Sequence, residues 1–424
     1  MLKEHSEVSP QRRARTNWLI GGAVALALAV ALTAGLVIYR AMGTSDETSS
    51  PVEASDEAAP PAVPSAPLST EVRAGLTLYA SPDGEKGPCT TVSPCTLSQA
   101  LETAPQQSTI KLLAGDYGKL KVRPTKATRT GTDVVVTAAE GAAVQLAGLD
   151  LYASNLTWRG LTMQGVLYLR GSATNTVIDQ FTLDSGGAFV RADDVVIKNS
   201  TFGYGTSLDG IQIGGAHRVR VESNVVHDYN QNGSSGYHSD CIQLFDSSDI
   251  VITRNRLSNC SNAGIIFSGG AGFGISRVTV ESNFIQSCIT KGVACRGGSA
   301  MDVREPGTRA TIVRNNTILN GSVRLGKQPD LIFDRNIIGY LADCTGVVTN
   351  SIIDKYNEGV CKDPEMLLRA GNRIGQVTFI DMPGGDLRPV SVSDVQIEPT
   401  GDFQPAAVTV DGDPMAANVA GAAN

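Results

Sequence analysis

The chain has 424 residues, of which 42% are hydrophobic, only 5% are aromatic and 45 are glycine. A net charge of −7 argues against a nucleic-acid partner, because no basic face is available to replace the counterions of phosphates. The length exceeds that of one typical domain, but a single elongated repeat fold could use most of it.

An uncharged stretch rich in Ala, Leu and Val occupies residues 18–39 and is long enough to cross a bilayer at about 1.5 Å per residue. Arg12, Arg13 and Arg15 precede it, and only Arg40 follows closely. The positive-inside rule then leaves residues 1–17 in the cytoplasm. A cleaved signal peptide is the alternative, but its apolar region usually has about 7–15 residues. We predict a single-pass protein of the cell membrane, with everything after the transmembrane helix outside the cytoplasm.

Two segments have low complexity. Residues 43–72 combine Pro with Ala, Ser and acidic residues, a composition that cannot bury enough apolar surface to fold. We expect a disordered linker there and a disordered tail at residues 401–424.

Between these segments, short apolar runs end repeatedly in a small or polar turn residue. The markers fall at positions 160, 180, 200, 224, 255, 283, 316 and 336. A second set of repeated positions supports the same repeat. Short stretches of alternating apolar residues directly follow Gly165, Gly187, Gly210, Cys241, Gly264 and Gly292. Stacked coils at about 4.8 Å per rung could bury the apolar faces that one coil leaves exposed, whereas propeller blades need about 40 residues each. The pattern therefore predicts an all-β parallel β-helix over residues 76–395.

Asparagine recurs at the end of successive strands, at Asn224, Asn255, Asn283, Asn316 and Asn336. Asn tolerates left-handed turn conformations, and stacked amides can satisfy one another. We interpret this column as structural.

The sequence resembles the right-handed parallel β-helix superfamily that includes pectate lyases. Residues 78–84, 95–104 and 110–117 resemble the entry of that fold, where a short helix caps the first coil. The Asn-ending strands resemble its coils, and residues 363–364, 379–381 and 385–388 resemble its exit. The resemblance implies a right-handed solenoid but does not single out one activity, because the superfamily includes lyases, hydrolases, epimerases and binding proteins.

All eight cysteines follow the predicted membrane span, and an even count in an exported chain indicates disulfides. Cys89–Cys95 would close a small loop, and Cys344–Cys361 is plausible near the exit. Cys260 and Cys288 both lie five residues after a marker Asn, which favours a Cys260–Cys288 bond, while Cys241–Cys260 remains open. No cysteine pattern fits a metal-thiolate site.

Polar residues that could carry chemistry concentrate in the coils at 209–245 and 291–305. Asp209 and Asp240 hold equivalent positions one rung apart, as do Gln212 and Gln243. Residues 238–243 resemble an H-x-D-x-I-Q pattern found in some bacterial β-helix proteins suspected of acting on polysaccharides. The remaining candidates are Lys291, placed two rungs beyond Asp240 and about 10 Å away, together with Arg296 and His227.

These residue types suit β-elimination on an acidic polysaccharide. Asp209 and Asp240 could hold Ca²⁺ to neutralise a sugar carboxylate, and His238 or Lys291 could remove the adjacent proton, with Asp240 as a catalytic carboxylate. Gln212, Gln243, Arg296 and His227 would contact the substrate. A hydrolase or epimerase using the two carboxylates, and a non-catalytic glycan-binding or envelope-structural protein, remain alternatives.

Overall fold

The computed structural model of the protein describes residues 75–125, 133–231, 238–289, 298–328, 330–344 and 347–424. The predicted cytoplasmic segment 1–17, the membrane span 18–39 and the linker 43–72 lie outside these residues, as do Lys291 and Arg296. Within the described ranges, no helix combines the length and apolar character needed to traverse a bilayer.

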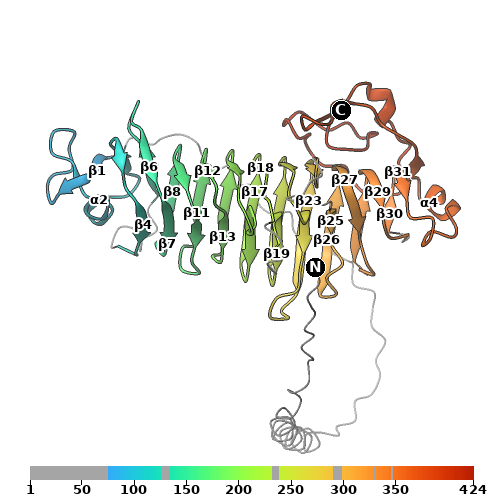
Figure 1. Ribbon diagram of the computed structural model, residues 1–424, viewed down its shortest axis with the longest axis horizontal. Helices are drawn as coiled ribbons and strands as arrows, with labels where there is room; N and C mark the ends of the chain where they lie inside the picture. The colour runs from blue at the N-terminus through green and yellow to red at the C-terminus, as the bar shows by residue number, and fades with distance from the viewer. Residues whose placement is uncertain (1–74, 126–132, 232–237, 290–297, 329, 345–346) are drawn as a thin grey trace, which may run out of the picture. The chain divides into compact units, whose positions relative to one another are not determined.

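The described chain forms coils that stack side by side as parallel strands, so the predicted all-β parallel β-helix is confirmed (Figure 1). Each complete coil contributes one strand to each of three ladders, which we call A, B and C. In one coil, for example, β8, β9 and β10 follow each other around the three faces.

Ladder A contains twelve strands. They are β1 Thr77–Glu85, β2 Thr109–Leu112, β5 Val134–Ala138, β8 Leu156–Arg159, β11 Thr176–Asp179, β14 Val195–Lys198, β17 His217–Glu222, β20 Ser248–Thr253, β23 Ile275–Glu281, β26 Thr308–Arg314, β28 Leu331–Asp334 and β30 Val348–Thr349.

Ladders B and C form one continuous sheet because three late strands belong to both. Ladder B contains β3 Gly115–Asp116, β6 Val144–Leu146, β9 Thr162–Gln164, β12 Thr182–Asp184, β15 Thr201–Gly203, β18 Val225–His227, β21 Arg256–Ser258 and β24 Phe284–Gln286. Ladder C contains β4 Lys119–Val122, β7 Gly148–Leu151, β10 Leu167–Leu169, β13 Ala188–Val190, β16 Ile211–Gly214, β19 Asp240–Phe245, β22 Ala263–Phe267 and β25 Ser299–Asp302. The shared strands are β27 Thr317–Arg324, β29 Ile337–Leu341 and β31 Ile352–Tyr356, and β32 Arg373–Ile374 extends ladder B.

The strands alternate between buried and outward side chains, as expected when one face of a sheet lines a core. In β14, Val195 and Ile197 are buried while Val196 and Lys198 point outward. The same alternation on each ladder stacks the apolar side chains of successive coils into one continuous core. Outward positions on the ladders are therefore the places where chemistry can reach solvent.

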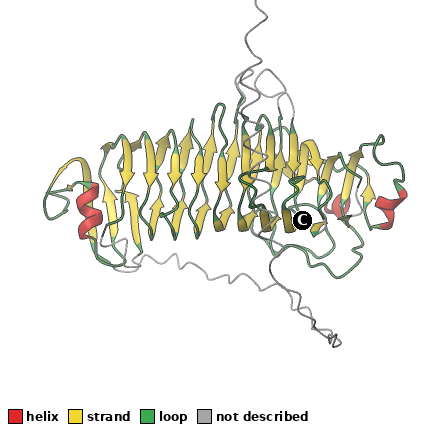
Figure 2. Ribbon diagram, turned by 90° about the horizontal axis from the view of Figure 1, so that it is seen from below, coloured by secondary structure: helices red, strands yellow, loops and turns green. Residues whose placement is uncertain are grey.

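A short helix covers the first coil, which confirms the predicted N-terminal cap. Helix α2 spans Leu97–Thr103 and buries Leu97, Ala100 and Leu101. It begins where the Thr96 hydroxyl accepts a hydrogen bond from the Gln99 amide, the usual way to satisfy a free N–H at a helix start. Figure 2 shows α2 at one end of the row of strands.

The asparagine column is a buried hydrogen-bond ladder. Each side-chain amide donates to the Oδ1 of the next Asn, at 3.0 Å from Asn224 to Asn255 and 3.0 Å from Asn255 to Asn283. The structural interpretation is thus confirmed for the stacked amides. The expectation that the Asn residues adopt the left-handed conformation is wrong. The residue with positive φ is the one before each Asn, such as Ser223 and Arg254.

The C-terminal part of the chain folds back along the last coils. It contains α4 Glu365–Arg369, the antiparallel pair β33 Phe379–Asp381 and β34 Asp386–Pro389, and the 3-10 turn η1 Val392–Val395. Residues 401–424 continue this packing, with Ala406, Val410 and Val419 buried. The expectation of a disordered tail is therefore wrong: small apolar residues occupy a cluster with side chains of ladder B.

Three disulfides join described cysteines: Cys89–Cys95, Cys241–Cys260 and Cys344–Cys361. The first and third were expected. The favoured Cys260–Cys288 bond is wrong, since Cys260 pairs with Cys241, the alternative left open by the sequence. Cys260 and Cys288 are equally spaced from their marker Asn residues, which correctly places them on adjacent rungs. This spacing does not predict the direction in which each cysteine side chain points.

Candidate functional site

The predicted pairing of two rungs on ladder C is correct. Strands β16 and β19 align Ile211 with Ile242 and Gln212 with Gln243. Asp209 precedes Ile211 by two residues, as Asp240 precedes Ile242, so the two aspartates are stacked one rung apart. The Asp240 amide donates to Asp209 Oδ1 at 2.9 Å, which fixes this stacking.

The register differs from the expected one beyond Asp240. Two rungs beyond Asp240, the aligned residue is Ser299, not Lys291. The coil between Ala263 and Ser299 is longer than the one between Asp240 and Ala263, which caused the error. On the other side of the column, Leu167 aligns with Ala188 and is buried, so Tyr168 is the outward residue of that rung.

Asp209, His238 and Asp240 converge into one group. His238 Nδ1 lies 2.7 Å from Asp240 Oδ2 and 3.8 Å from Asp209 Oδ1. The shorter contact does not have hydrogen-bond geometry, and neither of its two atoms makes a hydrogen bond elsewhere in the described chain; it is an ion pair when the imidazole is protonated. The His238 side chain is 42% exposed and Asp240 is fully buried, which leaves the histidine as the solvent-facing member.

The two carboxylates and the imidazole perturb one another. Burial, followed by repulsion from Asp240, raises the pKa of Asp209 to about 6. The contact with the Asp240 carboxylate raises the pKa of His238, and partial burial opposes this effect. Such mutually perturbed groups are typical of sites that transfer protons.

Gln212 links this group to a cation that the sequence did not identify as a site residue. Its amide nitrogen donates to Asp209 Oδ2 at 2.9 Å and to Gln243 Oε1 at 2.7 Å. Its Oε1 accepts from Arg191, a side chain with no acceptor capacity, which fixes the orientation of the amide. Arg191 could have been found from the sequence, because it lies two residues after the outward Phe189.

Asn262 is a second residue that the sequence reasoning missed. Its side-chain amide donates to Asp240 Oδ1 at 2.7 Å, so this oxygen is held while Oδ2 faces His238. Asn262 immediately precedes β22 and is not one of the repeated positions recognised in the sequence. Only the coil geometry brings it to the site.

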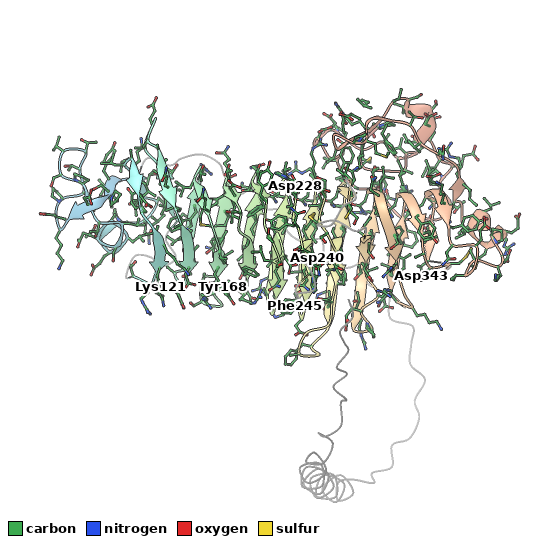
Figure 3. All side chains as sticks on the ribbon, viewed as in Figure 1. Lys121, Tyr168, Asp228, Asp240, Phe245 and Asp343 are labelled. Atoms are coloured by element: carbon green, nitrogen blue, oxygen red, sulfur yellow. A yellow bond between two sulfur atoms is a disulfide. The ribbon has the colours of Figure 1, made fainter. Side chains whose placement is uncertain are left out.

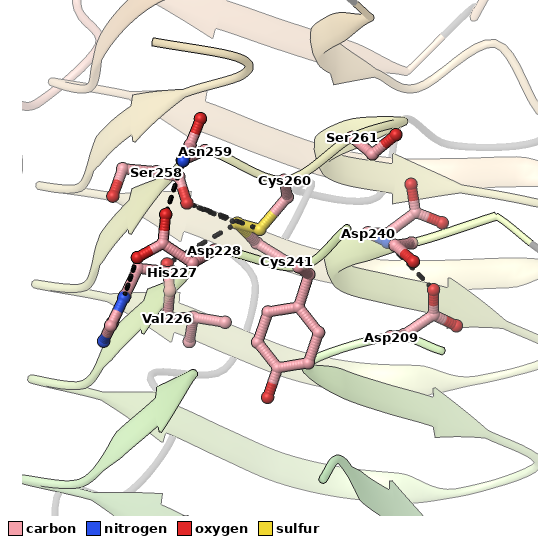
Figure 4. The surroundings of a disulfide bond; sticks show 12 residues. Asp209, Val226, His227, Asp228, Asp240, Cys241, Ser258, Asn259, Cys260 and Ser261 are labelled. Carbon is pink, nitrogen blue, oxygen red and sulfur yellow. Dashed lines mark hydrogen bonds and ion pairs between the residues drawn. A yellow bond between two sulfur atoms is a disulfide. The ribbon is translucent and has the colours of Figure 1, made fainter. Parts of the chain in front are cut away.

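The structure separates His227 from this group. His227 ends β18 on ladder B, and its Nδ1 lies 2.7 Å from Asp228. Figure 4 shows Asp209 and Asp240 on one side of the Cys241–Cys260 disulfide and His227 with Asp228 on the other. Its predicted substrate contact therefore does not share the site of Asp240.

A Ca²⁺ ion fits the described residues poorly. Asp209, His238 and Asp240 bring one ligand atom each within 4.8 Å of one another, so the group could hold a metal ion in principle. Ca²⁺, however, takes roughly six to eight oxygen ligands. Here one donor is an imidazole nitrogen, and both Asp209 oxygens and one Asp240 oxygen already accept hydrogen bonds.

Comparison with known proteins agrees with the architecture. The family model described as a right handed beta helix region matches residues 147–318. The match supports the right-handed parallel β-helix expected from the sequence. A search of curated proteins found no significant match.

Solved structures with low similarity include both enzymes and an adhesin. Pectate lyase Pel9A has 9% identity and a TM-score of 0.37, covering 81% of this chain and 88% of that one. A rhamnogalacturonan lyase has 13% identity and a TM-score of 0.35, covering 74% and 95%. PfbA, a surface adhesin of Streptococcus pneumoniae, has 12% identity and a TM-score of 0.33, covering 58% and 78%. None of these similarities assigns an activity to this chain.

Proposed function

We propose that this protein acts on an acidic polysaccharide by β-elimination, with His238 as the proton acceptor. The observation that carries the proposal is the group formed by Asp209, His238 and Asp240 on the outer face of ladder C. A membrane anchor at residues 18–39, with the β-helix outside the cytoplasm, completes the proposal and rests on the sequence pattern alone.

Asp240 would position the imidazole and strengthen it as a base. With Nδ1 against the Asp240 carboxylate, the other ring nitrogen, Nε2, is available to a sugar. Nε2 would take the proton from the carbon that bears the sugar carboxylate. The electron pair left on that carbon would form a carbon–carbon double bond, and the glycosidic oxygen would depart with the electron pair of its own bond. Water or the protonated imidazole would then protonate that oxygen. Lys291 as an alternative base and Arg296 as a group that binds the sugar carboxylate remain predictions from the sequence, since both lie outside the described residues.

The pH dependence of turnover follows from the state of His238. The imidazole accepts a proton only when neutral, and its contact with Asp240 raises its pKa. The acidic limb of the rate profile should therefore lie above the value of an ordinary histidine, about 6.5. Rates of product formation across pH 5–9 would check this expectation; a limb well below that value would assign the titration to another group.

Hydrolysis is the second candidate, favoured by one specific feature. Asp209 and Asp240 are one rung, or about 4.8 Å, apart, close to the roughly 5–5.5 Å separation used by retaining glycosidases. The raised pKa of Asp209, about 6, would suit a general acid. Against this reading, both carboxylates are buried and accept hydrogen bonds from the protein.

One assay separates these reactions. The full-length protein is incubated with polygalacturonate, alginate and other polyuronates while ultraviolet absorbance and new reducing ends are both followed. β-Elimination produces absorbing unsaturated ends and new reducing ends together, whereas hydrolysis produces reducing ends alone. His238→Gln should abolish both signals without preventing folding. Reducing ends without absorbance would replace the lyase proposal with the hydrolase, and neither signal on any polyuronate would leave a binding protein.

A further inference from the structure

Ladder C presents two neighbouring columns of outward side chains on the N-terminal side of Asp240. The aligned outward residues of six successive strands form the first column: Lys121, Asp150, Tyr168, Phe189, Gln212 and Gln243. The second column lies two residues further along each strand direction: Arg123, Tyr152, Arg170, Arg191, Gly214 and Phe245. We call these twelve positions the ladder C track.

Aromatic rings and guanidinium groups alternate along the track. The Arg170 guanidinium lies over the Tyr168 ring, 3.6 Å from its centroid, and Tyr168 stacks on Phe189 at 5.9 Å. Arg191 lies 5.9 Å from the Tyr168 centroid and 5.0 Å from that of Phe245. These contacts hold the half-buried rings in place before any ligand arrives, which lowers the entropic cost of binding.

Gly214 allows the last ring to join the series. A Cβ atom at this position would lie 2.1 Å from Phe245 Cζ, so the Phe245 ring occupies the space that any other residue would fill. This placement brings the ring to Arg191, whose guanidinium is hydrogen-bonded to Gln212. The track thereby reaches the Asp209–Asp240 group without interruption. Figure 3 shows Lys121, Tyr168 and Phe245 along the same edge of the molecule.

The track is cationic in an acidic protein. Four of its twelve positions carry Lys or Arg and one, Asp150, carries a carboxylate, whereas the whole chain has a net charge of −7. Asp150 is paired with Arg170 at 2.6 Å. For Lys121, Arg123 and Arg191, no carboxylate lies within ion-pair distance among the described residues. Lys121 and Arg123 thus remain available for an anionic ligand, whereas the Arg191 guanidinium already donates to the Val190 and Gln212 carbonyls and to Gln212 Oε1.

From this arrangement we propose that the ladder C track is a binding surface for several consecutive units of a carboxylated glycan. Pyranose rings would lie against the solvent-facing edges of Tyr152, Tyr168 and Phe245, whose faces are in contact with neighbouring side chains, and their carboxylates would meet Lys121 and Arg123. The inference deepens the proposed function, because the track delivers the glycan to the group around His238. The side chains that would hold the polymer lie up to five rungs from the reacting group.

The test is equilibrium binding of oligogalacturonate to the full-length protein by calorimetry at low and moderate salt. The fully methyl-esterified oligomer serves as the matched neutral ligand, because it has the same sugar rings without charge. Tyr168→Ala should weaken binding of the acidic oligomer about tenfold, the range expected for an aromatic anchor, while Tyr168→Phe keeps the ring and the affinity. Tyr204→Ala is the control, since Tyr204 is 60% exposed but follows β15 on ladder B.

Each outcome has a defined meaning. Salt-dependent binding of the acidic oligomer, lost in Tyr168→Ala and retained in Tyr168→Phe and Tyr204→Ala, supports the proposal. Equal affinity for the methyl ester overturns the carboxylate class, and unchanged affinity of a folded Tyr168→Ala variant overturns the track. Absorbance of unsaturated products, measured on the same samples, reports separately on the proposed function: binding without product contradicts the lyase reaction and leaves the track intact.

Discussion

The Asp240 carboxylate is held from two sides, by the Asn262 amide on one oxygen and His238 on the other. It is fully buried. Burial and then repulsion between the two neighbouring carboxylates raise the pKa of Asp209. The arrangement costs stability and is consistent with a role in chemistry rather than in folding.

Asp240→Asn should separate these roles. The amide oxygen can still accept from Asn262, while the charge next to His238 disappears. We expect turnover to fall by orders of magnitude, since lost charge stabilisation costs several kcal/mol of barrier, and the pKa of His238 to fall. Kinetics and a nuclear magnetic resonance titration of the His238 ring would measure both. Unchanged turnover per folded molecule would remove Asp240 from the site.

Asp209 predicts an unusual dependence of stability on pH. Its pKa is raised from 3.8 to about 6, so between these values the folded protein binds more protons at this residue than the unfolded chain. The free energy of unfolding from this group therefore falls as pH rises from about 4 to 6, by roughly 2–3 kcal/mol. Asp209→Asn should abolish this component, and urea unfolding at pH 4, 5 and 6 would measure the difference. Parallel curves for the two proteins would contradict the raised pKa.

The sequence predicted these residues well where the strand motif itself repeats, even across coils of different length. Asp209-Gly-Ile-Gln212 and Asp240-Cys-Ile-Gln243 share one pattern, so their alignment could be read directly. Arg191 and Asn262 were not assigned to the site because their contribution depends on side-chain direction between coils. Lys291 was given the wrong column for a related reason: the coil after β24 changes length, and Ser299 takes the aligned position.

At the scale of the element, the asparagine ladder joins neighbouring coils through buried hydrogen bonds. These bonds limit which residues can replace each Asn. Within the middle of the ladder, Asn283 donates to two backbone carbonyls and to Asn316, and it accepts from the Asn255 amides. Ser200 and Ser351 take the same place at the two ends of the ladder. Their hydroxyls accept from the amides of Phe181 and Asn336, and their own backbone amides donate to the Oδ1 atoms of Asn224 and Asn372. A hydroxyl can thus replace the amide where fewer contacts are needed.

Asn283→Ala should be among the most destabilising substitutions in the β-helix. It removes a buried side chain and leaves several donors and acceptors unpaired, each costing about 1–3 kcal/mol. Asn283→Ser should cost less, because a hydroxyl restores part of the ladder, as the Ser200 hydroxyl does by accepting from the Phe181 amide and donating to the Lys198 carbonyl. Urea unfolding of the two variants would compare them. Equal stabilities for Ala and Ser would show that the amide contacts contribute little.

At the scale of the whole described domain, the sequence predicted the solenoid but not its C-terminal cover. Repeats of apolar residues at alternate positions specify stacked coils, because each coil is stable only against its neighbours. Residues 401–424 have no such repeat, and their Ala, Gly and Asp content suggested disorder. Small residues nevertheless fit closely against the outer face of ladder B, where Phe284, Leu319 and Ile337 are buried beneath them.

Specific hydrogen bonds fix this cover in one register. The Asn315 side chain donates to the carbonyls of Val419 and Gly421 and accepts from the Ala406 amide. The Ser282 hydroxyl donates to the Val408 carbonyl. Buried polar groups of ladder B are thereby satisfied by the tail rather than by water.

Truncation of the chain after Thr400 should therefore destabilise the β-helix rather than leave it unchanged. It would expose Phe284, Leu319 and Ile337, and each apolar side chain that returns to water costs about 1.5–3 kcal/mol. We expect a clear fall in Tm and concentration-dependent aggregation through the uncovered face, measured by calorimetry and light scattering. Arg256→Gln is the matched control, since it removes the partly exposed pair with Asp411 and the contact with the Phe284 ring but leaves residues 401–424 in the chain, and it should cost much less than the truncation. A truncated protein with the same Tm as the wild type would show that residues 401–424 are dispensable for stability.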